Sequence, residues 1–100
     1  MYKKNVANSD LEELFTAIMS LENQQEYKAF FEDLCTVEEI KAMAQRWHVA
    51  RLLEEKSKYL DVQKLTGASS TTISRVKKCL EYGEGYALVF KKMKKEIDNN

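Results

Sequence analysis

The side chains that most often carry catalysis or bind metals are few and widely spaced in this sequence. Its single histidine, His48, could hold a zinc ion only together with Cys35 and Cys79, and these positions match no compact zinc motif. A cysteine–histidine nucleophile pair would need a group that orients the base and an oxyanion site, and no pattern indicates either. We therefore expect no metal site and no enzymatic activity.

Two other patterns could carry chemistry but fit a structural role better. Gly83-Glu84-Gly85 is not a phosphate-binding loop, because position 88 is leucine and no strand is predicted before it. The adjacent acids at positions 38–39 and 54–55 could act in acid–base catalysis, but they suit the solvated face of a helix. No cofactor is indicated by either pattern.

The strongest functional signal is a segment that combines hydroxyl and basic side chains. Short hydroxyls and the free N–H groups at a helix start can contact phosphates and base edges, and bases add charge-assisted contacts. The same pattern would also describe a solvated cationic helix with a serine cap. The predicted DNA-binding residues are Lys58, Lys64, Ser69, Ser70, Thr71, Thr72, Ser74, Arg75, Lys77 and Lys78.

Charge is unevenly distributed along the chain although the total is zero. Residues 10–39 hold nine acids and one base, a balance of −8. Residues 56–78 hold six bases and one acid, a balance of +5. The first segment should repel a polyanion and the second should attract one.

The spacing of apolar residues predicts six helices and no strand, which is an all-α fold. These helices are expected near 10–21, 24–34, 37–55, 59–65, 69–82 and 86–97. Ser9 with Glu12, and Thr36 with Glu39, have the spacing of capping boxes. In the segment 59–82, Gly67 is placed for a left-handed turn between two helices, Ser69 for the N-cap of the second, and Gly83 for its end.

The same spacing predicts which side chains are buried. In the helix near 59–65, Val62 and Leu65 should form the inner face. In the helix near 37–55 the buried residues should be Ile40, Met43, Trp47, Ala50 and Leu53. In the helix near 69–82 they should be Ile73, Val76 and Leu80, and in the last helix Leu88, Val89, Phe90, Met93 and Ile97.

Length and composition limit the class of protein. The 100 residues suit one small domain, and 44% hydrophobic with 32% charged residues suits a folded chain. The chain has no proline and three glycines, which disfavours tight-turned β folds. The longest apolar run spans five residues, Tyr86 to Phe90, so we expect no membrane segment, and no secretory signal is visible. Two cysteines without a signal favour the reducing cytoplasm.

Two segments carry a resemblance to a known family. Residues 36–46 (TVEEIKAMAQR) resemble the opening of the long core helix of the Trp repressor, and residues 65–75 (LTGASSTTISR) resemble its turn and recognition helix. Residues 65–86 are closer still to the YerC/YecD-type branch of Trp-repressor-like proteins. The resemblance spans roughly residues 10–95 and implies a six-helix, intertwined homodimer that presents two recognition helices to successive major grooves.

The resemblance also implies a pocket for a small-molecule co-repressor. Arg46 and Arg75 match the arginines that flank the indole ring in the family, and Thr36 matches a threonine whose backbone faces the ligand. Val76 stands where the family has a glycine, and Cys79 where it has a serine. The added bulk and the weaker hydrogen-bonding group disfavour tryptophan itself as the ligand.

Together these patterns predict a cytoplasmic, homodimeric regulator of transcription that binds double-stranded DNA in a sequence-specific way. Residues 1–100 should form one domain, with a dimerisation core at about 10–55 and 86–97 and a helix-turn-helix at about 59–82. The alternative is a protein-interaction module on the same fold, whose acidic helices dock a partner without DNA binding. DNA binding requires that Ser70, Thr71 and Arg75 be exposed.

Overall fold

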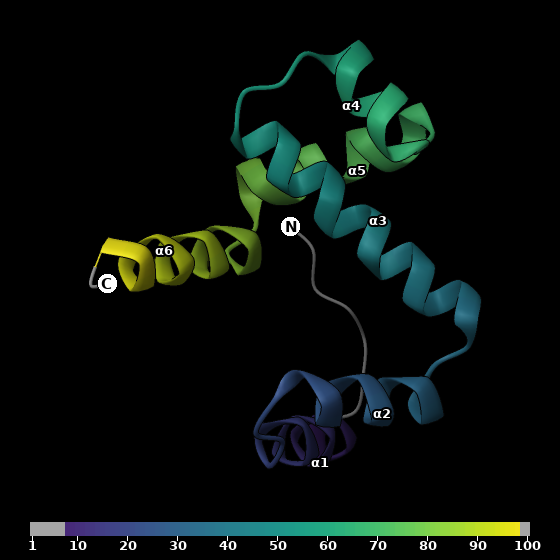
Figure 1. Ribbon diagram of the computed structural model, residues 1–100, viewed down its shortest axis with the longest axis vertical. Coiled ribbons are helices and arrows are strands. Elements are labelled where there is room, and N and C mark those ends of the chain that lie inside the picture. Colours follow the sequence, from purple (N-terminus) through teal and green to yellow (C-terminus); the bar gives the residue numbers. More distant parts are fainter. Residues whose placement is uncertain (1–7, 99–100) are drawn as a thin grey trace. The chain divides into compact units, whose positions relative to one another are not determined.

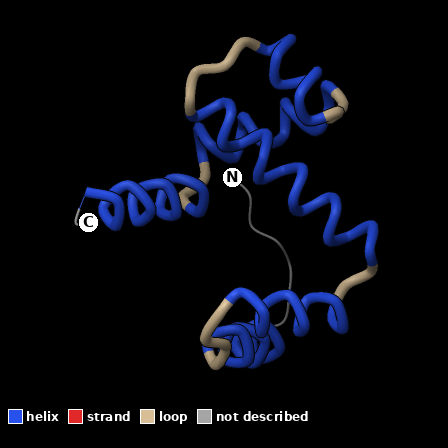
Figure 2. Tube along the Cα trace, in the orientation of Figure 1, coloured by secondary structure: helices blue, strands red, loops and turns tan. Residues whose placement is uncertain are grey.

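A computed structural model describes residues 8–98 and shows an all-helical chain over that range (Figures 1 and 2). The helices are α1 (Asn8–Met19), α2 (Gln24–Leu34), α3 (Val37–Glu54), α4 (Tyr59–Thr66), α5 (Ser70–Tyr82) and α6 (Gly85–Asp98). The six predicted helices and the all-α class are confirmed. Across the described range, none of the helices combines the length and the apolar character needed to span a bilayer.

The chain divides into two compact units at a boundary inside α3, between Ala42 and Met43. The first unit holds α1, α2 and the beginning of α3. The second holds the rest of α3 with α4, α5 and α6. The predicted dimerisation core joins residues from both units and concerns an assembly, so it stays a prediction.

Local side-chain caps fix the helix starts in the first unit. Thr36 and Glu39 form the predicted capping box at the start of α3: Thr36 N–H donates to Glu39 Oε1 at 2.8 Å, and Glu39 N–H donates to Thr36 Oγ1 at 3.1 Å. Asn23 caps α2 by accepting from Glu26 N–H at 3.0 Å. The predicted box at Ser9 is wrong, because α1 already begins at Asn8 and Ser9 lies within its first turn.

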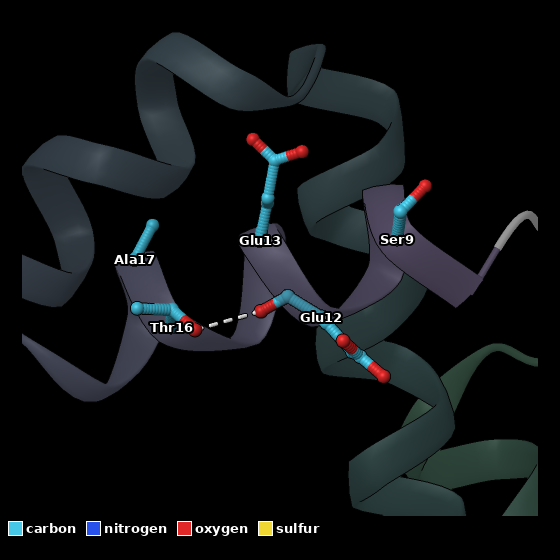
Figure 3. A pocket seen from close by; sticks show the side chains of 5 residues that line it. All are labelled: Ser9, Glu12, Glu13, Thr16 and Ala17. Atoms are coloured by element: carbon cyan, nitrogen blue, oxygen red, sulfur yellow. Dashed lines mark hydrogen bonds between the residues drawn. The ribbon is translucent and has the colours of Figure 1, made fainter.

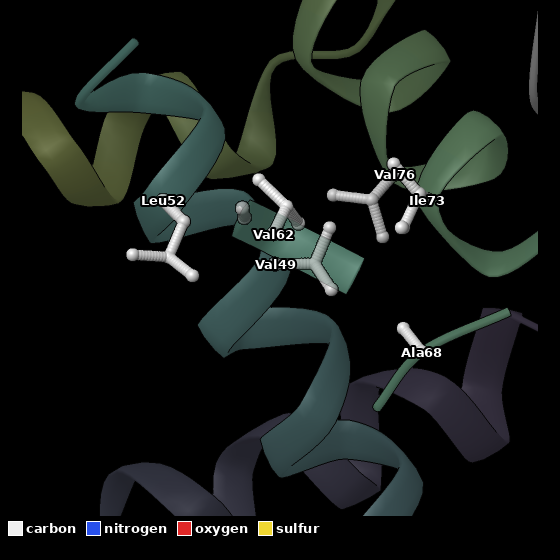
Figure 4. Close-up of a cluster of buried hydrophobic side chains, with 7 residues drawn as sticks. Val49, Leu52, Val62, Ala68, Ile73 and Val76 are labelled. Carbon is white, nitrogen blue, oxygen red and sulfur yellow. The ribbon is translucent and has the colours of Figure 1, made fainter. Parts of the chain in front are cut away.

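The core of the second unit joins α3, α4, the following turn and α5 (Figure 4). Its buried members are Val49, Ala50, Leu52, Val62, Ala68, Ile73 and Val76. Each large apolar side chain buried in this way contributes about 1.5–3 kcal/mol. The α6 helix joins this core through aromatic stacking, since the ring of Trp47 lies 4.9 Å from that of Phe90 and 6.2 Å from that of Tyr86, between centroids.

Some of the predicted core positions are wrong. Leu65 is 63% exposed, because Val62 and Thr66 occupy the inner face of the short helix α4. Met43 is 36% exposed, whereas the buried residues of α3 lie further along the helix, where α4 and α5 pack. In α6, four of the predicted core residues are exposed: Leu88, Val89, Met93 and Ile97. Only the first turns of α6 reach the core of the second unit, through Tyr86 and Phe90.

The connection between α3 and α4 contains a non-glycine residue in the left-handed region. Lys56 has a φ of 65°. Its N–H donates to the Leu53 carbonyl at 3.1 Å, and the N–H of Ser57 donates to the Leu52 carbonyl at 3.0 Å. This bonding pattern is a Schellman motif, in which the left-handed position is usually occupied by glycine. A side chain at this position therefore stores backbone strain.

Replacing Lys56 with glycine should stabilise the protein, because glycine adopts the left-handed conformation without a steric penalty. We expect a gain of about 1 kcal/mol in the free energy of unfolding, measured by urea denaturation at fixed protein concentration. Lys56→Ala is the matched control, since it removes the same side chain but keeps the Cβ atom. Equal stability of the two variants would contradict the strain at this position.

Candidate nucleic-acid interface

The turn between α4 and α5 is short and is closed by backbone hydrogen bonding. Gly67 caps α4 with φ 70° and ψ 9°, and its N–H donates to the Gln63 carbonyl at 2.9 Å. A Cβ atom at Gly67 would meet no atom within 4 Å, so the left-handed backbone alone requires glycine here. Ala68 follows in the core, and Ser69 precedes α5. The predicted left-handed turn at Gly67 is confirmed.

The first turn of α5 is fixed by two of its four hydroxyl groups. Ser69 Oγ accepts a hydrogen bond from Thr72 N–H at 3.1 Å and lies 3.1 Å from Thr72 Oγ1, to which it donates. This confirms Ser69 as the N-cap. The hydroxyls of Ser69 and Thr72 thus hold the helix start, whereas those of Ser70 and Thr71 are the ones left to meet a ligand.

The core contacts of α5 determine which of its side chains face solvent. Ile73 and Val76 are both 2% exposed, and Leu80 packs partly against the same cluster. The exposed residues of the helix include Ser70, Thr71, Ser74, Arg75, Lys77 and Lys78. We call these six residues the outer face of α5. Their exposure meets the geometric requirement for contact with a DNA groove.

The basic side chains on the outer face of α5 form no ion pair with a described carboxylate. Within the described residues, the one ion pair is formed elsewhere, between Arg51 and Glu55 at 3.4 Å on α3 and its C-terminal end. Arg75, Lys77 and Lys78 are therefore available for an external anion. Lys58, which precedes α4, and Lys64, in its last turn, are also exposed. That any of these residues contacts DNA stays a prediction.

The residues predicted to hold a co-repressor lie in different surroundings. Arg46 and Arg75 are exposed, Cys79 is half-buried, and Val76 is packed into the core. Thr36 belongs to the first unit, where its hydroxyl accepts the capping bond from the Glu39 N–H. The co-repressor pocket stays a prediction.

Tyr86, which is not among the predicted site residues, lies within electrostatic reach of two of these side chains. Burial raises the pKa of its phenol above the usual 10.0; Cys79 raises that pKa further, and Arg46 lowers it. The one signal in the sequence that could have identified Tyr86 is its spacing of four residues before Phe90, the other aromatic residue that stacks on Trp47.

The depression on α1 shown in Figure 3 does not have the features of a ligand site. It is lined by Ser9, Glu12, Glu13, Thr16 and Ala17. All five residues are exposed and come from one helix, and the Thr16 hydroxyl is bonded to the Glu12 carbonyl at 2.9 Å. Across the described residues, no three side chains of His, Cys, Asp or Glu are grouped so that they could hold a metal ion. The outer face of α5 is therefore the strongest candidate site.

Two helices joined by a three-residue turn, with an exposed hydroxyl-rich and basic face on the second, define the helix-turn-helix class. Comparison with known proteins then identifies the family. The family model described as "Trp repressor protein" matches residues 9–94, and the chain belongs to that family. This confirms the predicted family.

Relatives of known sequence and structure support the same assignment. The chain is 46% identical over 86 residues to the uncharacterized protein YerC of Bacillus subtilis (strain 168), covering 85% of this chain and 83% of YerC, which supports the YerC-type branch. A crystal structure of a candidate Trp repressor from Staphylococcus aureus matches with a TM-score of 0.83 and 42% identity, over 87% of this chain and 88% of the other. A TrpR-like protein from Eubacterium eligens ATCC 27750 matches with a TM-score of 0.83 and 46% identity, over 87% and 91%. The Trp-repressor-like fold is confirmed.

The raised pKa of Tyr86 makes a testable contribution to stability at alkaline pH. Unfolding exposes the phenol and returns its pKa to about 10, so the unfolded chain loses the proton first as pH rises. The wild type should therefore lose stability above about pH 10 more steeply than Tyr86→Phe, as measured by urea denaturation across that range. Identical pH dependence of the two proteins would contradict the burial of this phenol.

Proposed function

We propose that the protein is a transcriptional regulator that binds double-stranded DNA in a sequence-specific way through α5. The observation that carries the proposal is the division of α5 into two faces. Its apolar face is buried in the core of the second unit, and its outer face presents hydroxyl and basic side chains to solvent. Membership of the Trp repressor family supports the same function.

The dimensions of α5 suit a major groove. Ser70 and Lys78 are eight positions apart, so the outer face extends about 12 Å along the helix axis, which is comparable with the width of the groove. The free N–H groups at the start of α5 add a partial positive charge that favours phosphate. Ser70 and Thr71 are short enough to bring the helix start close to base edges, and the bases that follow can bind phosphates.

The charge distribution favours one orientation on DNA. Arg75, Lys77 and Lys78 lie on the outer face of α5, Lys58 precedes the neighbouring helix α4, and Lys64 lies in the last turn of α4. The net −8 of residues 10–39 would be repelled by phosphate. We therefore place the α4–α5 segment, and not the acidic segment, against the DNA.

Removing two bases from α5 tests DNA binding directly. Arg75→Ala combined with Lys77→Ala should weaken binding to duplex DNA by about tenfold or more and flatten the slope of log affinity against log salt by up to about two units. Fluorescence anisotropy with a duplex selected from random-sequence DNA measures both quantities. Because neither side chain is buried, circular dichroism should show an unchanged fold.

The matched control combines Lys28→Ala with Lys41→Ala, which removes two exposed bases outside the α4–α5 segment. It should leave the affinity and the salt slope close to those of the wild type. Wild-type affinity in the α5 variant would contradict the proposal. Absence of DNA binding by the wild type, with a protein partner retained instead, would favour the interaction-module alternative.

We propose that a second copy of the chain completes the fold. Among residues 8–42, no side chain is fully buried, so this described part of the first unit has no buried core of its own. Its exposed large apolar residues include Phe15, Met19, Leu34 and Val37. Exposed apolar side chains in such numbers are typical of an interface.

The last helix, α6, carries apolar and basic side chains that complement the apolar and acidic side chains of the first unit. Val89, Met93 and Ile97 continue the stripe that Tyr86 and Phe90 begin, and all three are exposed in the single chain. The helix also carries four lysines, Lys91, Lys92, Lys94 and Lys95, which suit the acidic first unit of a second copy. A dimer of this kind would present two α5 helices to one DNA duplex.

A charge placed in the apolar stripe of α6 tests the dimer. Met93→Asp should shift the mass from twice 11.7 kDa to 11.7 kDa in sedimentation equilibrium at micromolar concentration, because a carboxylate would have to be buried at the interface. Ala87→Asp introduces the same charge on another face of α6 and should leave the dimer intact. A monomeric wild type, or equal masses for the two variants, would contradict this interface.

A further inference from the structure

One side chain of α3 makes a directional contact with the turn that precedes α5. Gln45 Nε2 donates a hydrogen bond to the Thr66 carbonyl oxygen at 3.2 Å, and the contact is partly buried. Of the side-chain hydrogen bonds between described residues, it is the only one whose partners lie more than four positions apart in the sequence. It therefore ties the turn to a different helix, which no local cap can do.

The acceptor of this bond is a carbonyl that its own helix cannot satisfy. Thr66 is the last residue of α4, and the carbonyls of the last helical turn have no intrahelical donor. A partly buried carbonyl without a donor is unfavourable, and the amide of Gln45 supplies the missing donor. The Gln45 side chain thus completes the end of α4 from outside that helix.

Thr66 transmits this contact to both sides of Gly67. Its hydroxyl donates to the Val62 carbonyl at 2.7 Å and accepts from Ala68 N–H at 3.1 Å. One residue therefore joins α3, α4 and the backbone that leads into α5. Gly67 has wide conformational freedom of its own, so the bonds on either side of it define the path of the turn.

The position of Gln45 on α3 explains why the contact matters for α5. Gln45 lies four residues before Val49 and seven before Leu52, and therefore on the helix face that carries these core residues. Apolar contacts of this kind are not directional, so they bury one face of α5 without fixing how far its N-terminus extends. A hydrogen bond constrains both distance and angle.

We propose that Gln45 is a positioning residue for DNA recognition: through the Thr66 carbonyl it sets where the N-terminus of α5, with Ser70 and Thr71, lies against the DNA. Gln45 itself need not touch DNA. This inference rests on the proposed DNA-binding function.

Gln45→Glu turns the contact into a pH-dependent one. At about pH 8 the introduced carboxylate would face the Thr66 carbonyl oxygen and repel it, whereas a protonated carboxyl at about pH 5 could donate the hydrogen bond. Partial burial next to a carbonyl raises the pKa of such a group toward this range. We expect a loss of DNA affinity relative to wild type of about tenfold at the higher pH and of less than about threefold at the lower pH.

Two control variants separate positioning from charge and from general stability. Gln63→Glu places the same charge on α4, and its affinity relative to wild type should not recover at the lower pH. Gln45→Leu keeps the size but removes the donor, so its loss of affinity should be the same at both pH values. Each affinity is measured by anisotropy with one labelled duplex selected from random-sequence DNA. If the ratio of the DNA affinity of Gln45→Glu to that of the wild type is the same at both pH values, the proposal is overturned.

Amide hydrogen exchange provides a readout that does not depend on DNA. In Gln45→Leu, the protection of the Gly67 and Ala68 amides should fall, while that of the Ile73 and Val76 amides stays at the wild-type level. Unchanged protection in the turn would overturn the positioning role even if the wild type binds DNA well. If the wild type binds no duplex at all, the proposed function fails and recognition through Gln45 fails with it. The exchange data still decide whether Gln45 holds the turn.

Discussion

The burial of one face of α5 is the constraint on which the candidate site depends. Ile73 and Val76 are held against Val49 of α3 and Val62 of α4, so the rotation of α5 about its own axis is fixed by the hydrophobic effect. Once that face is buried, the hydroxyl and basic side chains of the outer face have to point to solvent. The same residues that stabilise the second unit therefore also present its site.

Apolar packing alone does not determine at which residues α5 begins and ends. Local contacts at each end of the helix determine these limits. Ser69 fixes the first turn through the Thr72 N–H, and Thr66 fixes the turn before it. At the other end, a Cβ atom at Gly83 would come within 2.8 Å of the Cys79 carbonyl oxygen. The C-cap of α5 therefore requires glycine, because a side chain there would clash with the helix backbone. Packing fixes the orientation of α5, and these contacts fix its limits.

The features that were predictable from the sequence depend on residues close together in the chain. The capping box of Thr36 and Glu39 and the turn at Gly67 involve partners at most four positions apart, and the outer face of α5 follows from helical spacing. The predicted burial of Leu65 is wrong because it depends on how α4 packs against α3, and the spacing of residues within α4 carries no information about that packing. The bond from Gln45 to Thr66 spans 21 positions, and nothing in either neighbourhood indicates it.

The exposure of the apolar residues of α6 also depends on contacts that local spacing does not contain. Its apolar stripe is continuous in the sequence, yet only Tyr86 and Phe90 find partners within the single chain. Residues 8–42 hold no fully buried side chain, and α6 has an apolar stripe that is mostly exposed, so one chain leaves two apolar surfaces uncovered. Small domains rarely reach stability with so little burial. If a second copy covers both surfaces, as proposed, folding of the first unit is coupled to the pairing of the two α5 helices in one equilibrium. The fully folded form is then also the form that can bind two successive major grooves.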